Sequence, residues 1–385
     1  MRVVKLIAYN TRRHPLRTTL TVLGLAVTVV AFSVIRTTID AWYAGADAAS
    51  PNRLVTRHAV SFTFLLPMSH QSKIESVDGV TGVAAGTWFG GTYIEPKNFF
   101  PQFAVDHEEY MRIYPEFVVP PEQMEAFRRE RNAVLVGRRL ADRFMWKLGD
   151  AVRLTGTVFP GDWDCVIRGI YIGAKEDTDE TLWFMRWDYI DERLRQESPG
   201  RAGWVGWFVV EIDDPSQAAA ISERIDAFFD NSRAETKTET EEAFNLGFVE
   251  MGSSIVLGLQ IVSVMVIGVI LLVLGNTMAM TARERVSEYA VLKTLGFRPI
   301  HLIGLIFGES LFIAALGAVA GLLVSVPALV LIRIQLEAFF PVFSVRVLTV
   351  MLAVGASMLV GLLAAIVPTV KAVRTRIVDG LRTID

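Results

Sequence analysis

Three long stretches without a charged residue dominate the C-terminal third of the chain. Ser253–Ala282, Ser310–Ile332 and Val347–Val370 contain no Asp, Glu, Lys or Arg. Each has at least the roughly 20 residues that a helix needs to cross about 30 Å of hydrocarbon. A fourth apolar run, from Thr18 to Ile39, carries a single charged side chain, Arg36. The pattern predicts four transmembrane helices.

The segment between the second and third apolar stretches differs from its neighbours. Arg283–Arg298 is rich in charge, but one face carries apolar side chains at helical spacing: Val286, Tyr289, Leu292 and Leu295. Gly296, followed by Pro299, is a typical signal for the end of a helix. The segment is therefore predicted to be a short amphipathic helix and not an irregular loop.

Asp40–Gly252 contains no other long apolar run and shows the patterns of an α+β domain. The predicted strands are Arg53–Leu66, Ala133–Val136, Ala151–Val158, Cys165–Ile172 and Val205–Ile212. The predicted helices are Pro121–Arg131, Gly137–Leu148 and Ser216–Asn231, the last with Ala219, Ile221, Ile225 and Phe228 facing inward. Thr236–Glu242 is predicted to be a polar, acidic hinge before the second transmembrane helix.

The charge distribution indicates which side of the membrane each part occupies. Asp40–Glu250 has 22 basic and 35 acidic residues, a net charge of −13, and the remainder has 16 basic and 6 acidic residues, a net of +10. Basic residues next to transmembrane helices mark the cytoplasmic side. They cluster in Arg2–Arg17, Arg283–Arg298 and Lys371–Arg382, which we therefore expect to be cytoplasmic. The acidic domain is expected outside the cytoplasm.

These expectations give one order of segments along the chain. They are a cytoplasmic amphipathic segment 1–17, helices 18–39, 253–282, 302–332 and 347–370, an extracytoplasmic α+β domain 40–252, a cytoplasmic helix 283–301, an outer loop 333–346 and a cytoplasmic tail 371–385. A cleaved signal peptide is the alternative for the N-terminus, although its apolar run is long for one. Cys165 is the single cysteine, so the domain has no intramolecular disulfide.

Catalytic and cofactor motifs are absent from the sequence. There is no G-x-x-x-x-G-K-[ST] phosphate-binding loop and no G-x-S-x-G motif. His107-Glu108 begins like a zinc-protease motif, but Met111 stands where the second histidine is required. The acidic tracts Glu176–Glu180 and Glu239–Glu242 lack the turn of a calcium-binding loop. They are therefore interpreted as solvated loops and not as calcium sites. The sequence predicts no enzyme, no bound cofactor or metal, and no nucleic-acid partner.

Two other features leave alternatives open. Glu309 stands at the inner end of the third helix, where it is either a tether for the amphipathic helix or an interfacial carboxylate. Gly317 and Gly321 form a G-x-x-x-G pattern that allows close helix packing. Several aromatic residues of the outer domain either bind a cargo or partner or pack in its core, and core packing is the favoured interpretation. These residues are Phe99, Phe100, Phe103, Trp183, Phe184 and Trp187.

Several segments resemble the membrane subunits of FtsX/MacB/LolC-type (type VII) ABC transporters. Leu16–Gly24 is similar to that family's entry into its first helix, and Arg283–Gly296 followed by Glu309-Ser310 looks like its inner segment between helices 2 and 3. In the outer domain, the likeness is to turns of the MacB-type extracytoplasmic domain: Val77–Val80, Ala104–Asp106 and Leu148–Asp150. Tyr289 departs from the family, which more often has isoleucine there.

The resemblance implies a permease subunit that dimerises, with a second copy or a paralogue, and docks a separate cytoplasmic ATPase that binds the ATP. Arg283–Gly296 would be the coupling helix, and ATP-driven motion would reach the outer domain to extrude or release a lipoprotein, lipid, peptide or hydrophobic compound. The ATPase-coupling residues would be Arg283, Arg285, Glu288, Leu292, Lys293, Leu295 and Gly296. Helix packing or tethering would involve Gly24, Glu309, Gly317 and Gly321.

Membrane lipid is an expected partner, and an extracytoplasmic adaptor is a further candidate. The alternative function is that of an FtsX-like regulatory protein that activates an extracytoplasmic partner such as a cell-wall hydrolase.

Overall fold

The computed structural model describes residues 15–175, 177–336, 343 and 345–377. The chain forms two compact units: one combines segments from both ends of the chain, and the other is Trp42–Met251. Most of the predicted segment 1–17, much of the predicted loop 333–346 and the end of the predicted tail 371–385 lie outside the described residues.

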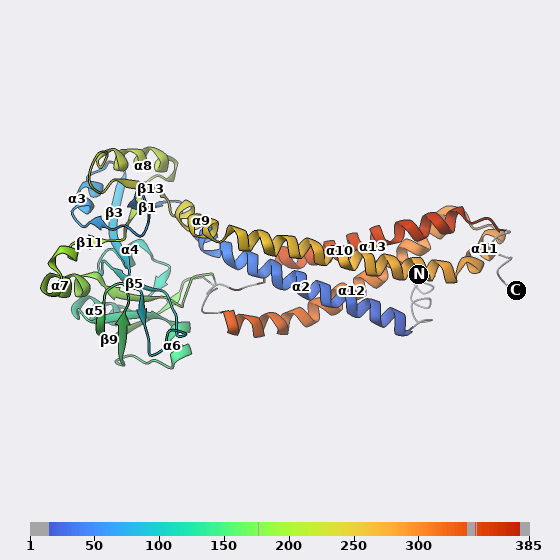
Figure 1. The fold of residues 1–385 in the computed structure, drawn as a ribbon, viewed down its shortest axis with the longest axis horizontal. Helices are drawn as coiled ribbons and strands as arrows, with labels where there is room; N and C mark the ends of the chain where they lie inside the picture. The colour runs from blue at the N-terminus through green and yellow to red at the C-terminus, as the bar shows by residue number, and fades with distance from the viewer. Residues whose placement is uncertain (1–14, 176, 337–342, 344, 378–385) are drawn as a thin grey trace. The chain divides into compact units, whose positions relative to one another are not determined.

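The first unit is built from four long helices, drawn in Figure 1. They are α2 (Pro15–Asp47), whose last residues belong to the second unit, α10 (Ser253–Glu284), α12 (Pro299–Leu336) and α13 (Val347–Arg374). Among the described residues, these are the four helices that are long and apolar enough to cross a membrane. The predicted fold class is confirmed: four membrane helices, with a large mixed α/β domain between the first and the second.

Small and hydroxyl side chains allow these helices to pack closely. A Cβ atom added at Gly317 of α12 would overlap Leu25 of α2, and one added at Gly321 would overlap Val29. Between α12 and α13, the hydroxyl of Ser310 donates to the carbonyl of Gly361 at 2.6 Å. Close approach through glycine and hydroxyl groups is typical of helices that associate in lipid.

The second unit is built on an eleven-stranded mixed sheet. Its order is β13-β1-β12-β3-β5-β10-β7-β9-β8-β4, with β6 paired to β9, and β11 pairs with β2 in a separate ribbon. The β10–β5 and β7–β9 pairs are parallel, and the others are antiparallel. The strands are β1 (Arg53–His58), β2 (Leu66–Pro67), β3 (Val80–Trp88), β4 (Gly91–Thr92), β5 (Gln102–Val105), β6 (Phe117–Val118), β7 (Ala133–Gly137), β8 (Ala151–Gly156), β9 (Gly161–Gly173), β10 (Trp183–Arg186), β11 (Trp204–Val205), β12 (Trp207–Ile212) and β13 (Thr236–Thr240).

Both faces of the central part of this sheet are buried. In β7, Val134 and Val136 belong to one hydrophobic cluster, whereas Ala133 and Leu135 belong to another, as expected for a strand covered on both faces. The covering helices are α3 (His70–Glu75), α4 (Tyr110–Ile113), α5 (Pro121–Arg129), α6 (Arg138–Phe144), α7 (Trp187–Glu197) and α8 (Ala218–Ala227), with 3₁₀ turns at Pro199–Arg201 and Pro215–Gln217. Helix α9 (Glu241–Met251) leads to α10.

The aromatic residues of this unit mainly pack in its core. Phe100, Trp183 and Phe184 are fully buried, whereas Phe99 is partly exposed. The core interpretation therefore holds for these three residues.

Three local predictions for this unit were wrong. Thr236–Glu242 is not a hinge, because Thr236–Thr240 forms edge strand β13 on β1 and Glu241 begins α9. Its alternating threonines turn inward, and Thr238 meets Thr56 across the strands at 2.9 Å between hydroxyl oxygens. Charged residues on the other face of an edge strand discourage pairing with further chains.

The second error concerns α8. Ala218 and Phe229 are buried there, whereas the predicted Ala219 and Phe228 are exposed. Ala218 lies three residues before the buried Ile221 and Phe229 four residues after the buried Ile225, so both continue the inward face, and Phe229 stacks on His70. The third error is the single strand Arg53–Leu66, since β1 ends at His58 and β2 begins at Leu66.

Candidate coupling site

A short helix, α11 (Val286–Thr294), links α10 to α12. It begins after Arg285, whose backbone angles (φ −105°, ψ 14°) interrupt the helix that ends at Glu284. It ends at Thr294, and Gly296 follows with a φ of +86°. The amide of Gly296 donates to the carbonyl of Lys293, and that of Phe297 to the carbonyl of Leu292, both at 3.1 Å. These two hydrogen bonds form a Schellman motif. The helix therefore ends just before Gly296 for the physical reason that the sequence indicated.

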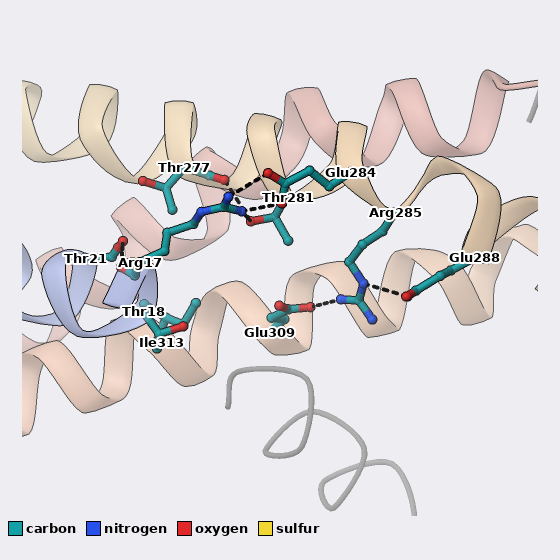
Figure 2. Close-up of a pocket in the computed structure, with 10 residues that line it drawn as sticks. All are labelled: Arg17, Thr18, Thr21, Thr277, Thr281, Glu284, Arg285, Glu288, Glu309 and Ile313. Atoms are coloured by element: carbon teal, nitrogen blue, oxygen red, sulfur yellow. Dashed lines mark hydrogen bonds and ion pairs between the residues drawn. The ribbon is translucent and has the colours of Figure 1, made fainter. Parts of the chain in front are cut away.

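Arg285 joins the start of α11 to α12. Its guanidinium donates to the carboxylate of Glu309 at 2.8 Å and to that of Glu288 at 2.9 Å (Figure 2). Arg285 and Glu309 are both buried, with 9% and 6% of their surfaces exposed. Burial alone would lower the pKa of Arg285, but its ion pairs offset this effect and hold the pKa above the ordinary value. Of the two interpretations of Glu309, a tether for the amphipathic helix or an interfacial carboxylate, this geometry fits the tether.

Lys293 ties the other end of α11 to α13. Its ammonium group donates to the carbonyls of Ala372 and Val373 at 3.0 Å, and to that of Thr375 at 2.7 Å. These carbonyls belong to the last turn of α13 and the residue after it, where helical acceptors lack partners. A cation there satisfies these acceptors and interacts favourably with the helix dipole.

A second ion pair, which the sequence did not suggest, joins α2 to α10. The guanidinium of Arg17 donates through both terminal nitrogens to the two carboxylate oxygens of Glu284, at 2.6 Å each (Figure 2). Arg17 also reaches the hydroxyl of Thr281 at 3.4 Å. The sequence does contain one indication of this pair, because Arg17 and Glu284 lie at the same predicted membrane boundary. Arg17 precedes its apolar stretch, and Glu284 follows its own.

The two ion pairs border a polar cavity of about 350 Å³ between α2, α10 and α12. Its lining contains both arginines and three carboxylates, together with threonine hydroxyls (Figure 2). The lining residues are Arg17, Thr18, Thr21, Thr277, Thr281, Glu284, Arg285, Glu288, Glu309 and Ile313. The end of the bundle is therefore held by charge and hydrogen bonding as well as by apolar packing.

The remaining predicted residues lie on α11 or next to its ends, and they divide between buried and exposed positions. Leu292 packs against a buried cluster that includes Tyr289 and Leu302, so it supports the turn from inside. Leu295 is 70% exposed, and Arg283 and Gly296 are also exposed. Three further exposed apolar side chains were missed by the sequence pattern. Together with Leu295 they form the α11 patch: Val291, Leu295, Phe297 and Ile300.

The glycines assigned to helix packing also differ in their surroundings. Gly317 and Gly321 lie against α2, but a Cβ atom at Gly24 would meet no atom within 4 Å. The packing role is therefore visible at the two glycines of α12 and not at Gly24. Among the described residues, no group of three His, Cys, Asp or Glu side chains is placed to hold a metal ion.

Two family models match the chain. The model of the MacB-like periplasmic core domain matches residues 18–228, and that of the FtsX-like permease C-terminal domain matches residues 260–377. The chain belongs to the MacB/FtsX-type permease family. It is thus a permease of the ABC-transporter type, a multi-pass membrane protein with an extracytoplasmic domain. The resemblance drawn from Arg283–Gly296 and from the outer-domain turns is confirmed at this level.

Solved structures similar to this permease are domains of other transporters. The extracellular domain of the ABC-type transporter YknZ from Gram-positive bacteria matches with 14% identity and a TM-score of 0.36, covering 49% of this chain and 100% of that one. The periplasmic region of MacB from Actinobacillus actinomycetemcomitans matches with 8% identity and a TM-score of 0.38, covering 52% and 94%. A domain of a permease protein from Porphyromonas gingivalis matches with 12% identity and a TM-score of 0.33, covering 49% and 88%. A comparison with curated proteins finds no match.

Proposed function

We propose that this permease docks a separate cytoplasmic ATPase through α11 and passes ATP-driven motion to its outer domain. The observation that carries the proposal is the α11 patch, four exposed apolar side chains around a helix that is itself fixed at both ends. The chain has no phosphate-binding loop of its own, so the ATP is bound by the partner.

The contacts of α11 supply a path for force. Arg285 links the start of α11 to α12 through Glu309, and Lys293 links its end to α13. The ion pair of Arg17 with Glu284 then connects α10 to α2. Pressure on α11 therefore acts on all four long helices, two of which, α2 and α10, enter and leave the outer domain along the chain.

The two ion pairs are suited to different tasks. The side chains of Arg285 and Glu309 are 11% and 8% exposed, so separating them would leave a charge buried without its partner. Those of Arg17 and Glu284 are 26% and 37% exposed, and water can replace their contact at a lower cost. We infer that α11 moves with α12 as one body, while α2 separates from α10 during the transport cycle.

The sidedness of the proposal rests on charge. The described basic residues Arg17, Arg283 and Lys371 stand at one boundary of the helices, which is the cytoplasmic side by the positive-inside rule. Both termini are then cytoplasmic, in a bacterial inner membrane. The second permease subunit is another copy or a paralogue, and the cargo is a lipoprotein, lipid, peptide or hydrophobic compound.

An FtsX-like regulatory role is the second candidate, since the same motion could activate an extracytoplasmic enzyme. The size of the outer unit, Trp42–Met251, favours transport, because it offers more surface than a simple relay needs. ATP-dependent release of a cargo supports transport. ATP-dependent activation of an outer hydrolase without cargo release supports regulation.

Co-purification tests the docking proposal. The tagged chain is expressed with its genomic neighbours, purified in mild detergent and analysed by mass spectrometry. A phosphate-binding-loop ATPase should accompany the native chain and be lost on Leu295→Asp. Leu148→Asp is the matched control, because Leu148 is also exposed but lies in the other unit. Retention of the ATPase by Leu295→Asp and by Val291→Asp would remove α11 as the docking element.

A further inference from the structure

An exposed apolar surface lies on the second unit, beside the helix that leads to the membrane. The loop Ala59–Leu65, between β1 and β2, exposes Val60 (75%), Phe62 (38%) and Phe64 (54%). The ring of Phe62 lies 5.3 Å from that of Phe248 on α9, which is itself 45% exposed. We call Val60, Phe62, Phe64 and Phe248 the loop patch.

The loop has a defined conformation. The hydroxyl of Ser61 lies 3.0 Å from that of Thr63, and the amide of Phe64 donates to the carbonyl of Ser61 at 3.2 Å. At its start, the amide of Ala59 donates to the carbonyl of Glu235 at 2.8 Å. These hydrogen bonds form a turn that holds the two phenylalanines away from the core, so that their apolar surface stays exposed.

The chain itself places the loop patch near a membrane boundary. Helix α9 ends at Met251 and α10, which is long and apolar enough to span, begins at Ser253. Five peptide steps separate Phe248 from Ser253, and they can extend over at most about 18 Å, whatever their conformation. Helix α9 is also joined to the end of α2, because the side-chain amide of Asn245 donates to the carbonyl of Gly45 at 3.1 Å.

The composition of the loop points to lipid and not to a charged partner surface. Ala59–Pro67 contains no charged residue, although Asp40–Glu250 as a whole has a net charge of −13. Apolar side chains such as Phe and Leu on segments that lie on a membrane are buried at the boundary between the head groups and the acyl chains. A contiguous exposed apolar patch on an acidic domain indicates an interaction site.

We propose that Ala59–Leu65 inserts into the outer leaflet of the bilayer next to α9, with Val60, Phe62 and Phe64 at the boundary between head groups and acyl chains. The loop is then a membrane anchor for the second unit, and it limits how far β1 can move from the lipid surface during a cycle. This role does not depend on ATPase docking through α11, so the two proposals succeed or fail separately.

The native cysteine makes a direct test possible. Cys165 is fully buried, and burial raises the pKa of its thiol to about 12, so it reacts poorly with thiol reagents at neutral pH. A nitroxide label can therefore be attached selectively to Phe62→Cys or Phe64→Cys in the full chain. Val158→Cys is the matched control: Val158 is 43% exposed and follows β8, near the opposite end of the sheet order from β1.

The labelled chains are reconstituted into vesicles of phosphatidylglycerol and phosphatidylcholine, and relaxation by oxygen is compared with relaxation by a water-soluble nickel chelate. Labels at positions 62 and 64 should show an oxygen-to-nickel accessibility ratio several-fold above that at position 158. Equal ratios at all three positions would overturn the proposal. Protection from both reagents would also overturn it, because protein would then cover the patch, and dipolar broadening between labels would identify a second copy as that protein.

Discussion

Removing the carboxylate of Glu241 should destabilise the second unit, because this buried group accepts three hydrogen bonds. Its Oε2 atom accepts from Arg53 at 2.7 Å and from the amide of Ser50 at 2.9 Å, and its Oε1 atom accepts from Tyr114 at 2.8 Å. Glu241 is 6% exposed and Arg53 is 5% exposed. Arg53 also pairs with Glu116 at 2.8 Å, so it would retain one anion after the substitution.

The size of the effect follows from this geometry. Breaking a buried ion pair by removing one partner costs about 3–5 kcal/mol, and the contact of Arg53 with Glu116 places Glu241→Ala near 3 kcal/mol. Glu241→Gln keeps the shape and two acceptor lone pairs but loses the charge, so about 1–2 kcal/mol is expected. Glu125→Ala is the control, because the pair of Glu125 with Arg129 is exposed and contributes about 0.5 kcal/mol or less.

Tryptophan fluorescence of the full chain in detergent can measure this difference. All eight tryptophans lie between Trp42 and Trp207, so urea unfolding followed by their emission reports on the second unit alone. The native chain and Glu125→Ala should be the most stable, Glu241→Gln should be less stable, and Glu241→Ala should be the least stable. Equal unfolding midpoints and slopes for the two alanine variants would refute the view that this buried pair stabilises the unit.

Three further predictions test other parts of the structure. Burial raises the pKa of Asp179 to about 6, from an ordinary 3.8, so the contribution of this carboxyl to the stability of the second unit should increase as the pH falls from about 6 to about 4. In urea unfolding, Asp179→Asn should remove that contribution, which changes by about 1–2 kcal/mol over this pH range. Gly317→Ile should lower the temperature at which the full chain loses its monodisperse gel-filtration peak, by overpacking worth about 1–3 kcal/mol, whereas Gly24→Ile should not, because Gly24 faces open space. Lys293→Met should accelerate hydrogen exchange in the last turn of α13 by removing its bonds to three carbonyls, and unchanged exchange relative to Arg374→Met would contradict the capping role.

The parts of the fold that the sequence predicted are those with a long or locally determined signal. An uncharged run such as Ser253–Ala282 has few structural alternatives, because its backbone must satisfy its own hydrogen bonds in lipid. The end of α11 was predictable from Gly296, since the φ of +86° is accessible to glycine at little cost. By contrast, Thr236–Thr240 is short and polar, and only its pairing with β1 makes it a strand.

The contacts of the candidate site show why local signals fail there. Arg285 and Glu309 lie on helices joined by a short connection, so a tether between them could be considered from the sequence. Arg17 and Glu284 are 267 positions apart, and their meeting requires that α2 and α10 lie together at matching heights. That placement depends on how α2 packs on α12 at Gly317, a contact whose partner Leu25 has no distinguishing feature in the sequence. The ion pair is therefore a consequence of helix packing, and it becomes visible only when the packing of all the helices is known.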